Sequence, residues 1–175
     1  QIRVIDLDGN GFADRMYASD MGGQVLRFDI FSGKSPGGTG TDALVTGGVV
    51  AQLGAEGLGS PAVEDTRRFY AAPDVSIFND NVQNRRFIAI SLGSGYRAHP
   101  LDDSNTDRFY SIRDKNVFTP LTQAEYDSFP KITEADLVEV SGQVGTLIGQ
   151  DKAGWMFTLP ADQKVFSNSV TFNNE

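Results

Sequence analysis

The chain has 175 residues and a mass of 19.0 kDa, enough for one domain with a hydrophobic core. Its formal net charge is −8, with a sequence pI near 4.6, so nucleic acid and anionic membrane surfaces are poor partners for it. It contains no cysteine, which excludes disulfides and thiolate-bound zinc, and it has no apolar run long enough to span a bilayer.

Short runs of aromatic and β-branched residues recur along the chain between glycine and Asx turns, a pattern typical of mainly β folds. We therefore expect an all-β sandwich or propeller with long loops and one or two short helices. The expected strands are Gln1–Ile5, Arg15–Ser19, Gln24–Ile30, Arg68–Ala72, Val75–Phe78, Arg85–Leu92, Arg108–Arg113, Gly145–Gly149, Gly154–Leu159 and Val165–Phe172.

Two segments depart from this pattern. Residues 32–60 are rich in glycine and are expected to form a long loop, with one strand inside the apolar stretch Ala43–Leu53. Residues 119–141 contain two helix starts, at Thr122 and Thr133, because each hydroxyl is followed three residues later by an acidic residue. Pro130 separates the two, so we expect a short helical insertion.

The strongest chemical signal is the run from Asp6 to Asp14, placed between two expected strands in a hairpin over residues 4–17. Oxygen-bearing side chains stand at the first, third, fifth and ninth positions of this run, as calcium-binding loops require. Glycine stands at the sixth position, where the chain bends sharply. The predicted calcium ligands are the side chains of Asp6, Asp8, Asn10 and Asp14 and the main-chain carbonyl of Phe12.

The loop departs from a full EF-hand because Tyr17 stands at the twelfth position, where a bidentate glutamate is usual. We expect a nine-residue site that closes on Asp14, with water or a distant residue completing the coordination and Asp20 as a candidate. The alternative is an Asx–Gly turn whose carboxylates are simply solvated. A second, weaker candidate cation site is the acidic segment 102–107, and His99, the single histidine, is expected to have a structural or surface role.

Several stretches resemble the C-terminal domain of PilY/PilC-type proteins, the tip-associated adhesins and assembly factors of type IV pili. The stretches that carry the likeness are Val4–Gly11, Asp14, Tyr17–Asp20, Gly22–Asp29, Gly93–Pro100, Phe109–Asp114, Gly154–Trp155 and Lys164–Ser169. The resemblance implies that residues 1–175 are a fragment of one modified β-propeller domain, with the calcium loop joining two strands of a blade.

The same resemblance implies a function without catalysis. Calcium occupancy in that family tunes the balance of pilus extension and retraction, and with it surface attachment and twitching motility. The implied location is the pilus tip at the cell surface, reached through the periplasm and outer membrane. The implied partners are minor pilins or other tip components, with host or abiotic surfaces bound through an N-terminal part. Two alternatives stay open: an enzyme like the quinoprotein dehydrogenases, which hold pyrroloquinoline quinone and calcium, and a purely structural domain stiffened by calcium.

Overall fold

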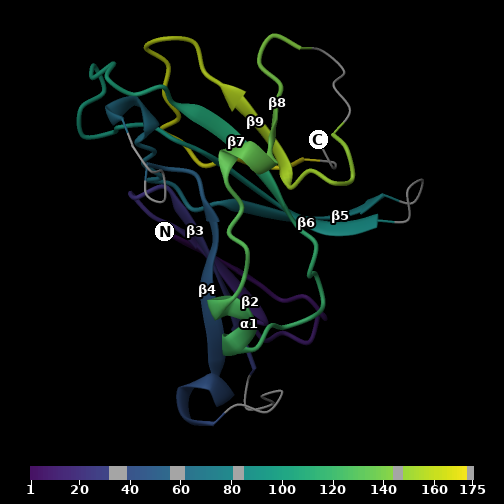
Figure 1. The fold of residues 1–175 in the computed structure, drawn as a ribbon. Coiled ribbons are helices and arrows are strands. Elements are labelled where there is room, and N and C mark those ends of the chain that lie inside the picture. The colour runs from purple at the N-terminus through teal and green to yellow at the C-terminus, as the bar shows by residue number, and fades with distance from the viewer. Residues whose placement is uncertain (32–38, 56–61, 81–84, 144–147, 173–175) are drawn as a thin grey trace.

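The computed structural model describes residues 1–31, 39–55, 62–80, 85–143 and 148–172. Two β-sheets face each other across one core (Figure 1). The first sheet has the order β1-β2-β3-β4 and the second the order β5-β6-β7-β9-β8. The strands are β1 (Ile2–Ile5), β2 (Arg15–Ser19), β3 (Gln24–Ile30), β4 (Val45–Gln52), β5 (Asp74–Asp80), β6 (Arg85–Gly93), β7 (Arg108–Asp114), β8 (Val138–Glu139) and β9 (Gly154–Thr158).

Every pairing is antiparallel except that of β8 with β9, so the chain builds each sheet largely from neighbouring hairpins. Alternate residues of β2 and β3 point toward the core. Apolar residues of both sheets and of the loops between them fill the space between the sheets. The core contains Tyr17, Val25, Val50, Ala51, Leu53, Phe69, Ile88, Ile90, Leu92, Tyr110, Ile112, Val117, Leu121, Tyr126 and Leu137.

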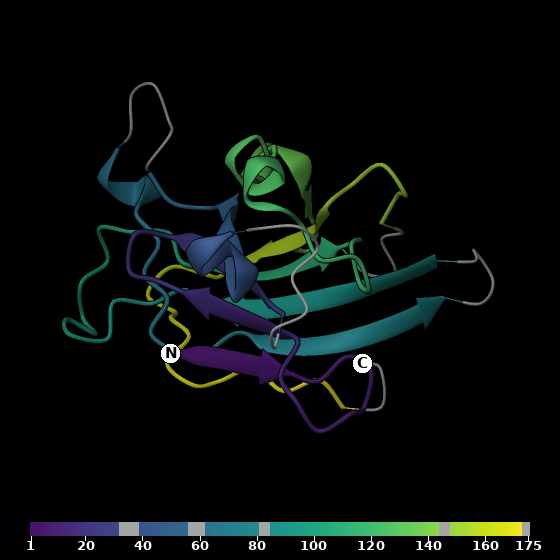
Figure 2. The same ribbon diagram turned by 90° about the horizontal axis from the view of Figure 1, so that it is seen from below.

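Helical structure in the described residues is brief. It consists of α1 (Gln123–Asp127) and three short 3₁₀ turns, η1 (Gly40–Ala43), η2 (Val63–Asp65) and η3 (Glu134–Asp136). The α1 helix packs on β4, where Gln123 Nε2 donates to the Gly47 carbonyl at 3.0 Å. Figure 2 shows α1 and β1 on opposite sides of the molecule. The reason is that β1 and β4 are the two edge strands of the first sheet, and α1 packs on β4.

The mainly β prediction is confirmed, and most expected strands are present to within one or two residues. The expected helical insertion at 119–141 contains α1, whose N-cap Thr122 accepts from Glu125 N, and η3 after Thr133. The expected strand within Ala43–Leu53 is β4, although it is a full partner of β3 rather than part of a loop. The rest of the glycine-rich stretch falls largely at 32–38 and 56–61, outside the described residues, as does most of the expected strand Gly145–Gly149.

Two expected strands are wrong. Arg68–Ala72 crosses between the sheets, where the Phe69 N–H donates to the Asp20 carbonyl at 3.1 Å, a loop contact rather than a ladder. Val165–Phe172 runs along the second sheet without forming a ladder. Val165 N donates to the Ser94 carbonyl at 3.0 Å, but the next contacts involve side chains: Ser169 Oγ donates to the Ser91 carbonyl at 2.7 Å and Thr171 N to Asp74 Oδ2 at 2.7 Å. The strand β8 was not foreseen.

Across the described ranges the sheets form neither a closed barrel nor a propeller, so the propeller remains a prediction. None of the helices in these ranges has the length and apolar character needed to cross a membrane.

Candidate metal centre

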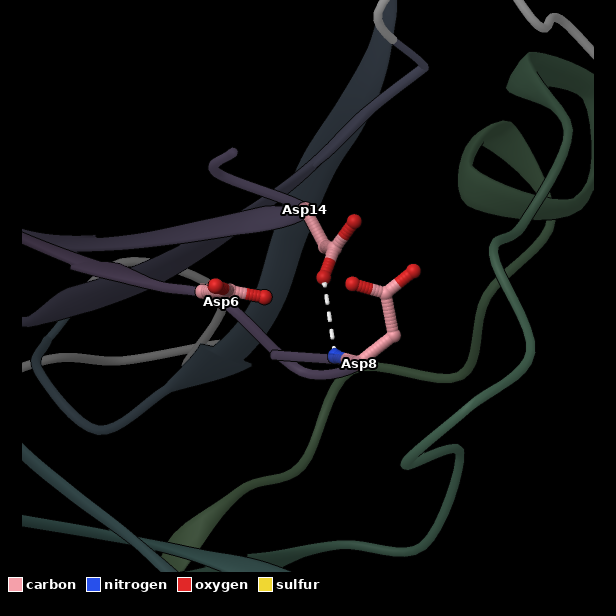
Figure 3. Close-up of side chains that lie close together, drawn as sticks. All are labelled: Asp6, Asp8 and Asp14. Atoms are coloured by element: carbon pink, nitrogen blue, oxygen red, sulfur yellow. Dashed lines mark hydrogen bonds between the residues drawn. The ribbon is translucent and has the colours of Figure 1, made fainter. Parts of the chain in front are cut away.

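The loop from Asp6 to Asp14 connects β1 to β2 and is closed at its base by a main-chain hydrogen bond from Asp14 N to the Ile5 carbonyl, 3.0 Å long. Each strand therefore delivers one carboxylate to the base of the loop, Asp6 just after β1 and Asp14 just before β2. Asp8 comes from the loop itself. Figure 3 shows the three carboxylates turned toward a common space.

Carboxylate oxygens of Asp6, Asp8 and Asp14 all lie within 4.8 Å of one another. In the part of the chain that the structure describes, this is the one place where three carboxylate, histidine or cysteine ligands converge in this way. Two unit charges about 4 Å apart repel by about 4 kcal/mol at an effective dielectric near 20, so three such groups favour a cation between them.

Asp6 organises the turn through main-chain hydrogen bonds. Its Oδ1 accepts from Gly9 N at 2.7 Å and from Asn10 N at 3.2 Å, and its Oδ2 accepts from Gly11 N at 2.7 Å. The bond from Gly11 is the largest influence on the carboxyl group, and it lowers the pKa of Asp6 below its ordinary value. Asp6 is therefore an anion around which the backbone is wrapped.

Asp14 ties the two ends of the loop together. Its Oδ2 accepts from Leu7 N at 2.6 Å and from Asp8 N at 3.3 Å, the latter bond being drawn in Figure 3. With one oxygen so occupied, the second oxygen of the carboxylate is left for a cation. These hydrogen bonds close the loop at Asp14, and the coordination of a cation by Asp14 remains a prediction.

Asn10 lies in the loop but points its amide elsewhere. Its Nδ2 donates to Asp8 Oδ2 at 2.8 Å, while its Oδ1 accepts from Phe12 N at 2.8 Å. An amide oxygen has two lone pairs, so the bond from Phe12 N leaves one lone pair of Oδ1 for a cation. Phe12 is 68% exposed, so its side chain lies mostly in solvent.

Two glycines make the turn possible. Gly9 has φ +75° and Gly11 has φ +89°, a region that residues with a side chain rarely adopt. The glycine that the calcium-loop pattern requires at the sixth position therefore has the backbone conformation that makes it necessary.

Two residues that the sequence placed near the site lie elsewhere. Tyr17 is fully buried in the core, and its hydroxyl donates to Asp114 Oδ2 at 2.5 Å. Asp20 follows the far end of β2, where its Oδ1 accepts from Gly22 N and Gln24 N at 2.9 Å. Asp20 therefore caps the β2–β3 turn and does not complete the coordination, because the whole of β2 separates it from Asp14.

The other sequence candidates form no comparable site. In the acidic segment 102–107, Asp102 Oδ1 accepts from Ser104 N at 2.9 Å, whereas Asp107 is buried and accepts from Ser94 Oγ at 2.6 Å. Their carboxylates thus serve separate local contacts. His99 is exposed and lies against the Tyr96 ring, 4.9 Å between centroids, in keeping with a surface role.

A buried ionic network next to the loop was missed by the sequence reasoning. Arg15 and Arg27 are each 1% exposed, and both bind Asp29 and Asp114. Tyr126 Oη adds a bond to Asp29 Oδ2 at 2.7 Å. The sequence signal for three of these residues was alternation, because Arg15, Arg27 and Asp29 occupy the same inward-facing positions of β2 and β3 as Tyr17 and Val25.

The network reaches from the loop to the segment 116–120. Arg15 donates through Nη1 to the Asn116 carbonyl at 2.8 Å, and Arg27 through Nη2 to the Thr119 carbonyl at 2.9 Å. A cavity of about 160 Å³ separates this segment from the loop and is lined by Leu7, Asp8, Asp14, Arg15, Asp29, Ile30, Phe118 and Pro120.

The fold and the loop together define a mainly β, two-sheet domain with an exposed hairpin turn on which three carboxylates converge. Among solved structures, this fold is similar to the crystal structure of the Pseudomonas aeruginosa PilY1 C-terminal domain, with a TM-score of 0.60 and 18% sequence identity. The match covers 94% of this chain and 39% of the PilY1 chain. No protein-family model and no curated protein matches the sequence. The chain therefore has a PilY1-like fold and spans well under half of that neighbour.

Proposed function

We propose that this chain is a calcium-binding regulatory segment of a type IV pilus tip or assembly protein. The observation that carries the proposal is the convergence of Asp6, Asp8 and Asp14 within 4.8 Å on a fold similar to the PilY1 C-terminal domain. The stretches that resemble PilY/PilC-type proteins in sequence, Val4–Gly11 among them, include this loop. Fold and loop thus support the same family.

The donor set suits calcium. Asp6, Asp8 and Asp14 offer carboxylate oxygens, Asn10 offers an amide oxygen and Phe12 a main-chain carbonyl. Calcium accepts about six to eight oxygen ligands in flexible geometry, whereas magnesium needs a near-ideal octahedron and keeps more of its water. An exposed loop of mixed oxygen donors, with water completing the coordination, therefore selects calcium.

Calcium binding would stabilise the conformation of the loop that binds it, through thermodynamic linkage. A ligand present at about 1,000 times its Kd stabilises the binding conformation by about 4 kcal/mol. We infer that calcium orders the β1–β2 hairpin for a partner at the pilus tip, such as a minor pilin, and so biases pilus extension against retraction. Surface attachment and twitching motility follow from that balance. The site is a binding module at the cell surface and has no catalytic role in this proposal.

The test is calorimetry with calcium and with magnesium on the native chain and on the variants Asp6→Ala and Asp14→Ala. Asp103→Ala is the matched control, since Asp103 is an exposed aspartate outside the loop. We expect calcium binding that both loop variants abolish and the control retains, with magnesium binding far weaker. Undiminished calcium binding by Asp14→Ala would overturn the assignment.

A measurement in cells distinguishes the proposed regulatory role from the purely structural alternative. If calcium only stiffens the hairpin, strains carrying Asp6→Ala or Asp14→Ala display pili and attach as the parent does, provided the protein is present at equal amounts. The proposal requires altered pilus display or attachment with the protein level unchanged.

A further inference from the structure

We propose that Asn10 is a deamidation site and that bound calcium slows its deamidation. The site itself follows from the residues and their exposure. The protection by calcium rests on the proposed function. Asn10–Gly11 is the single Asn–Gly pair in the sequence, and it lies at the centre of the loop.

The reaction needs no catalyst and no reagent but water. The Gly11 main-chain nitrogen attacks the side-chain carbonyl carbon of Asn10 and gives up its proton to solvent. The bond from that carbon to the amide nitrogen breaks, and ammonia leaves a cyclic succinimide. Water then opens the ring at either carbonyl, to aspartate or to isoaspartate. Glycine favours the first step because it has no side chain to obstruct the attack and its backbone is the most permissive.

The structure leaves this dipeptide accessible. Both Asn10 and Gly11 are exposed, and a Cβ built on Gly11 would meet no heavy atom within 4 Å. Packing therefore does not restrain the pair, and only the hydrogen bonds of the loop do.

Those hydrogen bonds oppose the reaction while the loop is closed. Gly11 N is held by Asp6 Oδ2 at 2.7 Å, and the Asn10 amide is held by Asp8 Oδ2 at 2.8 Å and by Phe12 N at 2.8 Å. For Gly11 N to reach the Asn10 carbonyl carbon, these contacts must break. Deamidation therefore proceeds from the opened loop, and whatever holds the loop closed slows it.

Calcium is the agent that closes it. The carboxylates of Asp6, Asp8 and Asp14 repel one another, and without a cation between them this repulsion raises the population of the opened turn. If the calcium-bound loop does not react, the observed rate falls by the factor 1 + [Ca²⁺]/Kd, about 100-fold at a calcium concentration of 100 Kd. The deamidation rate is thus itself a measure of occupancy.

The two products differ in consequence. Aspartate keeps an oxygen donor at position 10 and adds a carboxylate. Isoaspartate inserts a methylene into the main chain, which moves Gly11 N away from Asp6 and breaks the turn that Asp6 organises. The longer the chain stays without calcium, the larger the fraction that contains isoaspartate, and this fraction no longer binds calcium.

The experiment incubates the intact chain at mildly alkaline pH over a series of calcium concentrations and in chelator, and follows both products by peptide mapping. Asn168–Ser169 is the internal comparison, because Asn168 is exposed and lies far along the chain from the loop. We expect Asn10 to convert faster than Asn168 in chelator, and its rate to fall with calcium at the Kd found by calorimetry. Asn168 should not respond to calcium.

Three outcomes decide the matter. Conversion of Asn10 no faster than that of Asn168 in chelator overturns the site. Equal conversion of Asn10 with and without calcium, in protein that calorimetry shows to bind calcium, overturns the protection. Absence of calorimetric binding overturns the proposed function, while rapid Asn10 conversion would still support the site. Calorimetry on the aged native chain completes the test: its calcium capacity should fall in proportion to the isoaspartate that peptide mapping finds at position 10, and full capacity in a chain largely converted to isoaspartate would overturn the loss of binding.

Discussion

Arg15 donates from Nε to Asp29 Oδ1 at 2.6 Å, with both side chains no more than 2% exposed. Arg15 directly follows Asp14, the residue on which the acidic loop closes. The buried ionic network and the candidate calcium site are therefore joined by one peptide bond, and the network in turn holds the carbonyls of Asn116 and Thr119.

Replacing Asp29 by asparagine should destabilise the fold severely. Asp29 accepts from both Arg15 and Arg27, and also from Leu121 N at 2.9 Å and Tyr126 Oη at 2.7 Å. Removing one partner of a buried ion pair leaves charge uncompensated and costs about 3–5 kcal/mol. Denaturant unfolding should show a loss of this size for Asp29→Asn.

The matched change Asp103→Asn, on an exposed aspartate, should alter the free energy of unfolding by less than about 0.5 kcal/mol. If the two variants proved equally stable, the network would contribute nothing net to stability.

Calcium should slow amide hydrogen exchange in residues 116–121. Asp8 and Asp14 form one wall of the cavity whose other wall includes Phe118 and Pro120, and Arg15 bonds directly to the Asn116 carbonyl. When calcium orders the loop from Asp6 to Asp14, it therefore also restrains residues 116–121.

The measurement is hydrogen exchange followed by mass spectrometry, with and without calcium. The strand β9, on the other sheet, is the internal reference and should be unchanged. Slower exchange confined to residues 5–15 would show that the loop binds its ion without affecting the segment.

The elements that could be predicted from sequence are those whose signal is local. The strands β2 and β3 alternate inward and outward residues, Thr122 and Glu125 form a capping pair, and the loop oxygens follow a fixed spacing. In each case the physical cause lies within a few residues, so one stretch of sequence contains it.

What could not be predicted depends on partners distant in the chain. Arg15 and Asp114 are almost 100 positions apart, and although alternation along β2 places Arg15 inward, no local pattern indicates that Asp114 is its partner. The segment Val165–Phe172 looks like a strand, yet Ser169 and Thr171 use side-chain and single main-chain contacts to the second sheet. Asp20 illustrates the same limit: its sequence distance from the loop is short, but β2 carries it to the opposite end of the hairpin.

The ionised carboxylate of Glu139 should stabilise the fold, and acidification should remove this stabilisation. Burial by itself raises the pKa of this carboxyl group, but hydrogen bonds from Ser141 and Thr158 outweigh it and lower the pKa to about 2. The folded state thus binds the proton less well than the unfolded state, whose ordinary value is 4.5. The stabilisation is complete above the unfolded value and is lost as the pH falls through the folded one.

The comparison is the free energy of unfolding of the native chain and of Glu139→Gln from neutral pH down to pH about 2. The native chain should be the more stable at neutral pH, and its advantage should shrink as the solution is acidified below the unfolded pKa. An advantage that is independent of pH would show that the Glu139 charge makes no difference to folding.

Gly154→Ala should be far more damaging than Gly142→Ala, although both glycines have positive φ, +146° and +71°. A Cβ at Gly154 would collide with the Ser111 carbonyl oxygen on the paired strand β7, whereas one at Gly142 would meet nothing within 4 Å. Gly142→Ala therefore costs only the backbone strain, about 1 kcal/mol, because left-handed φ is unfavourable for alanine. Gly154→Ala adds about 1–3 kcal/mol of overpacking and must push β9 away from β7. Thermal unfolding of the two variants beside the native chain tests this difference, and equal losses would contradict the close approach of the two strands at Gly154.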